Sequence, residues 1–170
     1  MTPHERVRRL LHVGATPESL PCRDEQFQAV VDCTSDVLRA GAGGCAYICG
    51  VPGTGKTATV REAVRTLQAM QERGHLPSFT FVEINGMKLA SPMQAYTELW
   101  CAISGDRHRL HPRAALTRLS SHFHAPAPAG RQPTVVLMDE LDLFVTSRQD
   151  VIYNMFHWPD MPGSLSLIHI

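Results

Sequence analysis

Residues 50–57 read Gly50-Val-Pro-Gly-Thr-Gly-Lys-Thr57, which matches in full the pattern Gly-x4-Gly-Lys-Ser/Thr of a phosphate-binding P-loop. The glycines allow the backbone to wrap around a polyphosphate, and the N–H groups at the start of the next helix face the anion. A short apolar segment, residues 45–49, precedes the motif, and apolar residues at helical spacing follow from Val60 to Met70. The motif thus lies between a strand and an amphipathic helix, and it predicts a nucleotide-binding site.

Within this motif, Lys56 would reach the β- and γ-phosphates, and Thr57 would place its hydroxyl on Mg²⁺. The alternative is a Gly/Pro-rich turn that carries an incidental lysine. The chain has only two lysines, Lys56 and Lys88, against 14 arginines, so a lysine at this position by chance is not expected.

Two acidic residues follow the most apolar strand of the sequence. Residues 134–138 form a continuous apolar run of the kind that is buried on both faces of a parallel sheet, and Asp139 and Glu140 come directly after it. In open α/β sheets, ligands bind outside the carboxyl ends of the strands. Asp139 would hold the metal beside Thr57, and Glu140 would polarise a water and stay close to the metal. Alternatively, the pair only caps the next helix.

The rest of the chain alternates strands with helices, which predicts a three-layer αβα fold with a parallel sheet, the architecture of P-loop NTPases. A capping box at Ser91-Pro92-Met93-Gln94 would start one of the helices. The remaining predicted strands span residues 45–49 and 79–84, and the predicted helices span about residues 24–40, 91–103, 112–123 and 148–156.

Composition excludes several classes of protein. The chain has 170 residues, 16 basic and 16 acidic, so the formal net charge is zero and the average charge does not indicate nucleic-acid binding. No apolar stretch approaches the ~20 residues that a membrane-spanning helix needs, and the N-terminus lacks the features of a signal peptide. Five cysteines without regular spacing are typical of a reducing compartment. We expect an intracellular protein without a membrane partner.

One segment is strongly basic. Residues 107–131 contain five arginines, four histidines and no acid. The segment is either a solvated helix face followed by a loop, or a surface that contacts nucleic-acid phosphates or an acidic partner.

Several segments together resemble the AAA+ ATPase module of the family formed by the largest subunits of eukaryotic origin recognition complexes. The resemblance covers about residues 10–160. The segments Ile84-Asn-Gly-Met-Lys-Leu89 and Val136-Leu-Met-Asp-Glu-Leu-Asp-Leu143 narrow it from NTPases in general to replication initiators. The related helicase-licensing ATPase is the nearest alternative. The other matching segments are Leu20-Pro-Cys-Arg-Asp-Glu-Gln-Phe27, Gly50 to Val60, Arg148-Gln-Asp-Val-Ile-Tyr-Asn154 and Trp158-Pro159.

The resemblance implies a nuclear subunit that binds ATP and Mg²⁺ and acts in origin DNA binding and in the initiation of DNA replication by helicase loading. The implied partners are the other subunits of the complex, the licensing ATPase, origin double-stranded DNA and the replicative helicase. ATP hydrolysis is expected only in the assembly. Thr57, Asp139 and Glu140 would surround the metal, with Glu140 as the catalytic residue that positions water, and Lys88 would contact DNA. The residues implied around the nucleotide are Thr16, Gly50, Val51, Pro52, Gly53, Thr54, Gly55, Lys56, Thr57 and Ala58.

The resemblance also divides the chain into three parts. Residues 1–21 are an N-terminal extension, whose segment 16–21 would lie over the adenine, and residues 22–160 are the nucleotide-binding core. Residues 161–170 form a divergent tail. In a sheet of order 5-1-4-3-2, only residues 164–170 are available as the fourth strand, between the P-loop strand and the acidic-motif strand. Family members continue into a sensor strand, a helical lid and a winged helix, so we expect a fold that is incomplete at the C-terminus. The alternative function is that of a truncated fragment that binds protein partners without catalysis.

Overall fold

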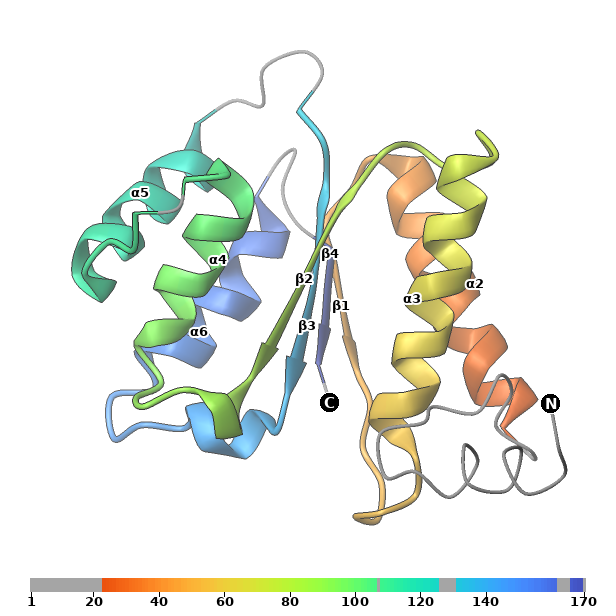
Figure 1. Cartoon of the computed structure of the whole chain (residues 1–170), viewed down its shortest axis with the longest axis horizontal. Coiled ribbons are helices and arrows are strands. Elements are labelled where there is room, and N and C mark those ends of the chain that lie inside the picture. Colours follow the sequence, from red (N-terminus) through yellow and green to blue (C-terminus); the bar gives the residue numbers. More distant parts are fainter. Residues whose placement is uncertain (1–22, 107, 126–130, 162–165, 170) are drawn as a thin grey trace, which may run out of the picture.

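The computed structural model describes residues 23–106, 108–125, 131–161 and 166–169. It has three layers, with a parallel sheet between two groups of helices (Figure 1). The strands are β1 (Gly44–Tyr47), β2 (Thr80–Asn85), β3 (Thr134–Asp139) and β4 (Ser166–His169). The helices are α2 (Asp24–Ala40), α3 (Lys56–Glu72), α4 (Gln94–Ser104), α5 (Pro112–His124) and α6 (Asp150–His157), with short 3-10 turns η1 (Gly86–Lys88), η2 (Leu141–Phe144) and η3 (Trp158–Asp160).

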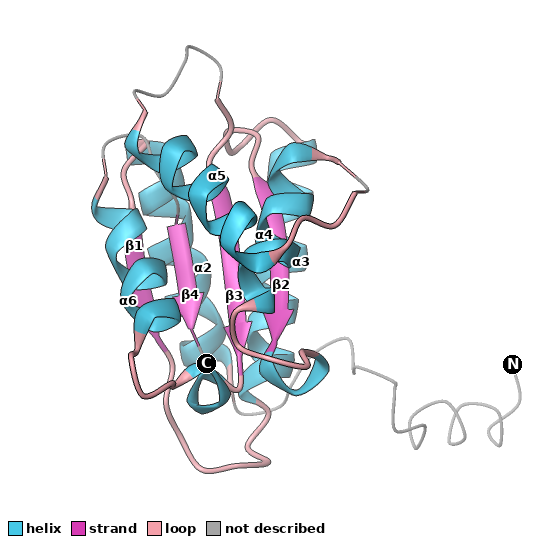
Figure 2. Cartoon of the chain, turned by 90° about the vertical axis from the view of Figure 1, so that its left-hand side faces the viewer, coloured by secondary structure: helices cyan, strands magenta, loops and turns pink. Residues whose placement is uncertain are grey.

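The sheet has the strand order β1-β4-β3-β2, and each neighbouring pair is parallel (Figure 2). β4 therefore lies between the P-loop strand and the acidic-motif strand, which is the place expected for residues 164–170. The predicted three-layer α/β fold with a parallel sheet is confirmed.

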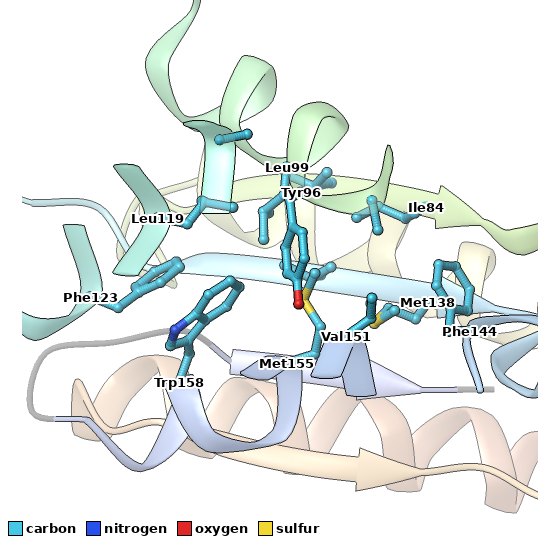
Figure 3. Close-up of a cluster of buried hydrophobic side chains, with 14 residues drawn as sticks. Ile84, Tyr96, Leu99, Leu119, Phe123, Met138, Phe144, Val151, Met155 and Trp158 are labelled. Carbon is cyan, nitrogen blue, oxygen red and sulfur yellow. The ribbon is translucent and has the colours of Figure 1, made fainter. Parts of the chain in front are cut away.

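Each face of the sheet has its own core because side chains alternate along β3, which is buried at all six positions. Val135 and Leu137 face α2 and α3, whereas Val136 and Met138 face α4, α5 and α6. In the core between the sheet and helices α4, α5 and α6, the centroid of the Trp158 ring lies 5.0 Å from that of Phe123 (Figure 3). The Trp158 ring meets the Tyr96 ring edge-on, with centroids 5.9 Å apart. The two cores hold the strands in place, and with them the carboxyl ends of β1 and β3, where the P-loop and Asp139 lie.

The predicted capping box at the start of α4 is wrong. The regular helix begins at Gln94, after N–H to C=O bonds of the 3-10 type in residues 91–96. The Gln94 side chain does reach back, but it accepts from the N–H of Ala90 at 3.0 Å, one residue before the predicted cap. The tight turn takes the place of a side-chain cap. Similarly, α6 begins at Asp150 rather than at residue 148, because Gln149 is left-handed, with φ 53°.

Candidate nucleotide-binding site

The carboxyl ends of three strands converge at one edge of the sheet. β1 leads into the P-loop, β3 ends at Asp139, and β2 ends at Asn85, which pairs with Asp139 in the sheet register. α3 starts directly after the loop, with Gly55 as its N-cap. Strand ends and a helix start therefore meet at the same place, as expected for an anion site in an α/β sheet.

The P-loop has the conformation that its glycines predict. Gly53 and Gly55 have φ values of 77° and 81°, a left-handed region that strongly favours glycine. The Thr54 hydroxyl donates to the carbonyl of Val51 at 2.8 Å and closes the loop on itself. No side chain caps the start of α3, so its first N–H groups remain available to an anion.

Lys56 lies across the loop. Its ammonium donates to the carbonyl of Gly50 at 3.0 Å and to that of Val51 at 3.3 Å. This places a positive charge beside the N–H groups of α3, where it adds to the positive end of the helix dipole. The arrangement attracts a polyphosphate.

Asp139 is held on both of its oxygens. It is buried, with 5% exposure; Oδ1 accepts from the Thr57 hydroxyl at 3.1 Å, and Oδ2 accepts from the Asn85 amide at 2.9 Å. Thr57 and Asp139 are 82 positions apart in the sequence, and the fold brings them into contact. A hydroxyl and a carboxylate are hard oxygen ligands, which suit Mg²⁺ when a substrate phosphate and waters complete the octahedron.

Glu140 turns away from the sheet. Its backbone is left-handed, with φ 58°, a conformation that costs about 1–2 kcal/mol in a residue other than glycine. Its carbonyl accepts from the N–H of Leu143 at 3.0 Å and starts η2. The side chain is exposed and lines the same cavity as Lys56 and Asp139.

The residues predicted to bind the nucleotide line two cavities, as far as the structure describes these residues. The larger, of about 690 Å³, reaches from the P-loop to Asp139 and Glu140. The smaller, of about 270 Å³, lies between the P-loop and α2, where Arg23, Gln26 and Val30 form its far wall. Thr16 lies outside the described residues. The larger cavity is lined by Gly50, Pro52, Gly53, Gly55, Lys56, Thr57 and Ala58, and the smaller one adds Val51 and Thr54.

Sequence reasoning missed two polar residues at this site. Asn85 holds Asp139, and Arg61 lines the larger cavity while its Nη2 donates to Glu83 Oε1 at 2.5 Å. The hydrogen bond to Glu83 raises the pKa of Arg61, so the guanidinium stays charged. Both residues carry a detectable signal: Arg61 follows Thr57 by one helical turn, and Asn85 ends a strand parallel to the one that ends at Asp139.

Lys88 lies in η1, next to the site but not in it. It is exposed and lines neither cavity. η1 is nevertheless linked to Asp139, because the Asn85 side chain, which donates to Asp139, also accepts from the N–H of Met87 at 2.8 Å. In the part of the chain that the structure describes, no three His, Cys, Asp or Glu side chains gather as a metal site, and no helix could cross a bilayer.

The sequence matches known proteins over nearly all of its length. It is 43% identical over 167 residues to origin recognition complex subunit 1 of Schizosaccharomyces pombe, covering 98% of this chain and 23% of that protein. It is 45% identical over 160 residues to subunit 1 of Mus musculus, covering 94% and 19%. The chain thus spans about a fifth of the length of these relatives. The resemblance to this group of subunits, expected from the sequence, is confirmed.

Solved structures share the fold. The structure of Drosophila ORC bound to DNA contains a chain that superposes with a TM-score of 0.87 at 40% identity, covering 97% of this chain and 43% of that one. The Aeropyrum pernix ORC1 protein in complex with DNA superposes with a TM-score of 0.75 at 23% identity, covering 95% and 41%, which shows a shared fold. A family model described as an AAA ATPase domain matches residues 19–168, so the chain belongs to the AAA ATPase domain family.

Proposed function

We propose that this chain is the nucleotide-binding part of a nuclear origin recognition complex subunit, which binds ATP with Mg²⁺ and acts in origin DNA binding and replication initiation. The observation that carries the proposal is the contact between the Thr57 hydroxyl and Asp139 beside the P-loop. The identity of 43–45% to subunit 1 of that complex from two organisms supports the assignment to replication initiation.

Each residue of the site has a distinct task. The N–H groups at the start of α3 and the Lys56 ammonium bind the β- and γ-phosphates, and Thr57 and Asp139 hold the metal. Mg²⁺, when bound, neutralises charge that develops on the phosphate oxygens. Glu140 positions a water for attack on the γ-phosphate, in line with the bond to the leaving oxygen. Asn85 keeps the Asp139 carboxylate turned toward Thr57.

ATP hydrolysis takes place in the assembled complex. One solved structure that is 40% identical to this chain is of ORC bound to DNA. We infer that the partners of this chain are the other subunits of the complex, the licensing ATPase, the replicative helicase and origin duplex DNA, which Lys88 would contact through a phosphate. ATP hydrolysis requires neighbouring subunits that complete the cavity.

Thermal stabilisation by ATP and Mg²⁺ tests the proposal. A ligand at a hundred times its Kd stabilises the folded state by about 2.7 kcal/mol, and for this size of domain each kcal/mol shifts Tm by roughly 2–4 °C. We expect the wild-type chain to shift by several degrees and Lys56→Ala to show no shift. Arg39→Ala, which removes a positive charge from the exposed face of α2, serves as a control that keeps the shift. Unchanged nucleotide affinity in Lys56→Ala, or no shift of the wild type at millimolar ATP, contradicts the proposal.

A further inference from the structure

The neutral net charge of the chain hides a segregation of charge. Residues 107–131 carry five arginines and no acid, a formal charge of +5. The remaining 145 residues contain the other 11 basic residues and all 16 acidic ones, a formal charge of −5. Such an asymmetry indicates a surface for a polyanion, which the rest of the molecule would repel.

The structure gathers part of this charge on the outer side of α5. α5 packs chiefly against α4, and its apolar face of Ala115, Leu119 and Phe123 is buried. The other side of α5 is exposed and carries Arg113, Arg118 and His124, and the exposed N-cap residue His111 precedes it; we call these four side chains the α5 basic surface. α5 itself lies on the opposite side of the molecule from the loop between β1 and α3 (Figure 1).

The two arginines of the α5 basic surface are uncompensated. Among the described residues, neither Arg113 nor Arg118 forms an ion pair. The nearest acid on α4, Glu98, is already taken, because Arg109 Nη2 lies 3.0 Å from its Oε1. Asp106 accepts from the N–H of His108 at 2.9 Å. Two guanidinium groups with all their donors available therefore face solvent.

The other basic groups of the segment play a structural part. The His122 ring packs edge-on against Trp100 and Phe123, and burial, with a smaller effect of Arg131, lowers its pKa, so that His122 is neutral near pH 7. Arg131 donates to the carbonyl of His122. These contacts hold the C-terminal end of α5 in place. Arg113 and Arg118 therefore remain as the arginines of α5 that are available to a ligand.

The chemistry of the face favours nucleic-acid phosphates over a protein partner. The hot spots of protein interfaces are mostly Trp, Tyr and Arg side chains that cluster in well-packed, desolvated pockets. Among the described residues, no exposed large apolar side chain comes from α5; the exposed face adds only Ala114, Thr117 and Ser121 to the basic groups. Arginine and hydroxyl side chains are among the usual partners of phosphate oxygens. Arg113 and Arg118 are five residues apart, about 7.5 Å along the helix axis and about 140° around it, so they lie on the two flanks of the exposed side.

We propose that the α5 basic surface is a second contact for duplex DNA, in which Arg113 and Arg118 bind backbone phosphates independently of base sequence and of bound nucleotide. This deepens the proposed function, since it assumes that the chain works on DNA. It adds a site on α5, separate from Lys88, which lies in η1. With this second site, the chain would contact the duplex backbone at α5 as well as at η1.

The test is a salt titration of the full 170-residue chain with a fluorescein-labelled DNA duplex of mixed sequence. Each phosphate contact contributes about 0.9 to the slope of log K against log[salt], so Arg113→Gln with Arg118→Gln lowers the slope by about 2. Between about 50 and 200 mM salt, the affinity of the wild type then falls about twelvefold more than that of the double variant. The matched control is Arg39→Gln with Arg73→Gln, which removes the same charge from α2 and from the end of α3 and keeps the wild-type slope.

The outcomes separate this inference from the proposed function. An unchanged slope in the Arg113/Arg118 variant, with a reduced slope in Lys88→Ala, overturns the α5 contact and leaves the proposed function standing. Equal losses in both double variants also overturn it, because charge anywhere on the surface would then suffice. If polyglutamate displaces the duplex as well as unlabelled DNA does, the surface is an acidic-protein site and the inference is wrong. The ATP-induced shift in Tm must persist in the Arg113/Arg118 variant, which shows that the variant is folded.

Discussion

At the scale of single residues, the site depends on how Asp139 is held. Its two oxygens each accept one hydrogen bond, from Thr57 and from Asn85. The grouping of Lys56, Thr57, Asp139 and Glu140 around one cavity is predictable from the sequence, because a P-loop and an acidic pair after an apolar strand are local patterns. Asn85 was missed because its partner is 54 positions away and is set by the register of β2 against β3.

The Asn85 hydrogen bond can be tested directly. Asn85→Ala leaves Oδ2 of a buried carboxylate without its partner and frees the carboxylate to rotate away from Thr57. Loss of an orienting partner of a metal ligand typically costs 10–100-fold in metal affinity, so we expect the Mg²⁺ concentration needed for half-maximal ATP binding to rise by about that factor. ATP binding can be followed by calorimetry at several Mg²⁺ concentrations.

Asn154→Ala is the matched control. It removes an amide that donates to the Tyr96 hydroxyl at 2.9 Å, in the α6 core rather than at the cavity. It should lower stability and leave the Mg²⁺ dependence unchanged. An equal Mg²⁺ dependence in Asn85→Ala and wild type would show that Asn85 has no positioning role.

At the scale of elements, η1 and η2 pack so closely that only glycine fits between them. A Cβ on Gly86 would lie 2.9 Å from Cβ of Leu143 and 3.0 Å from the carbonyl oxygen of Glu140. The strands and most helices follow from apolar periodicity, but this contact between two short turns does not, since neither turn has a repeating pattern. The predicted start of α4 was wrong for the same reason, because a tight turn takes the place of the predicted side-chain cap.

Gly86→Ala should therefore push η2, and Glu140 with it, away from the sheet edge. Overpacking of this kind typically costs about 1–3 kcal/mol, so Tm falls, and we expect ATP affinity in Mg²⁺ to fall as well. Denaturant unfolding and calorimetry measure the two effects. Leu116→Ala, in the α5 packing, is the control, since it should lower stability alone. If Gly86→Ala loses stability but binds ATP as tightly as wild type, η1 and the site are not coupled.

At the scale of the whole molecule, the sheet assembles one site from distant parts of the chain. The order β1-β4-β3-β2 sets the P-loop strand two positions from the acidic-motif strand, and β4 fills the gap between them. The resemblance predicted this order, whereas hydrophobic patterns alone predict only alternating strands and helices. The sequence leaves two interpretations of the basic segment 107–131, a solvated helix face or a binding surface. It cannot decide between them because packing against neighbouring elements determines which face of a helix is exposed.

The central claim is that the fold builds a Mg²⁺-dependent ATP site from the P-loop and Asp139. The most direct measurement is a calorimetric titration of ATP into the wild-type chain and into Asp139→Asn, each in Mg²⁺ and in EDTA. The account predicts that Mg²⁺ tightens ATP binding by the wild type by about tenfold or more, and that Asp139→Asn binds ATP equally weakly in both solutions. Wild-type binding of equal strength in Mg²⁺ and EDTA, or no ATP binding at all, would contradict it.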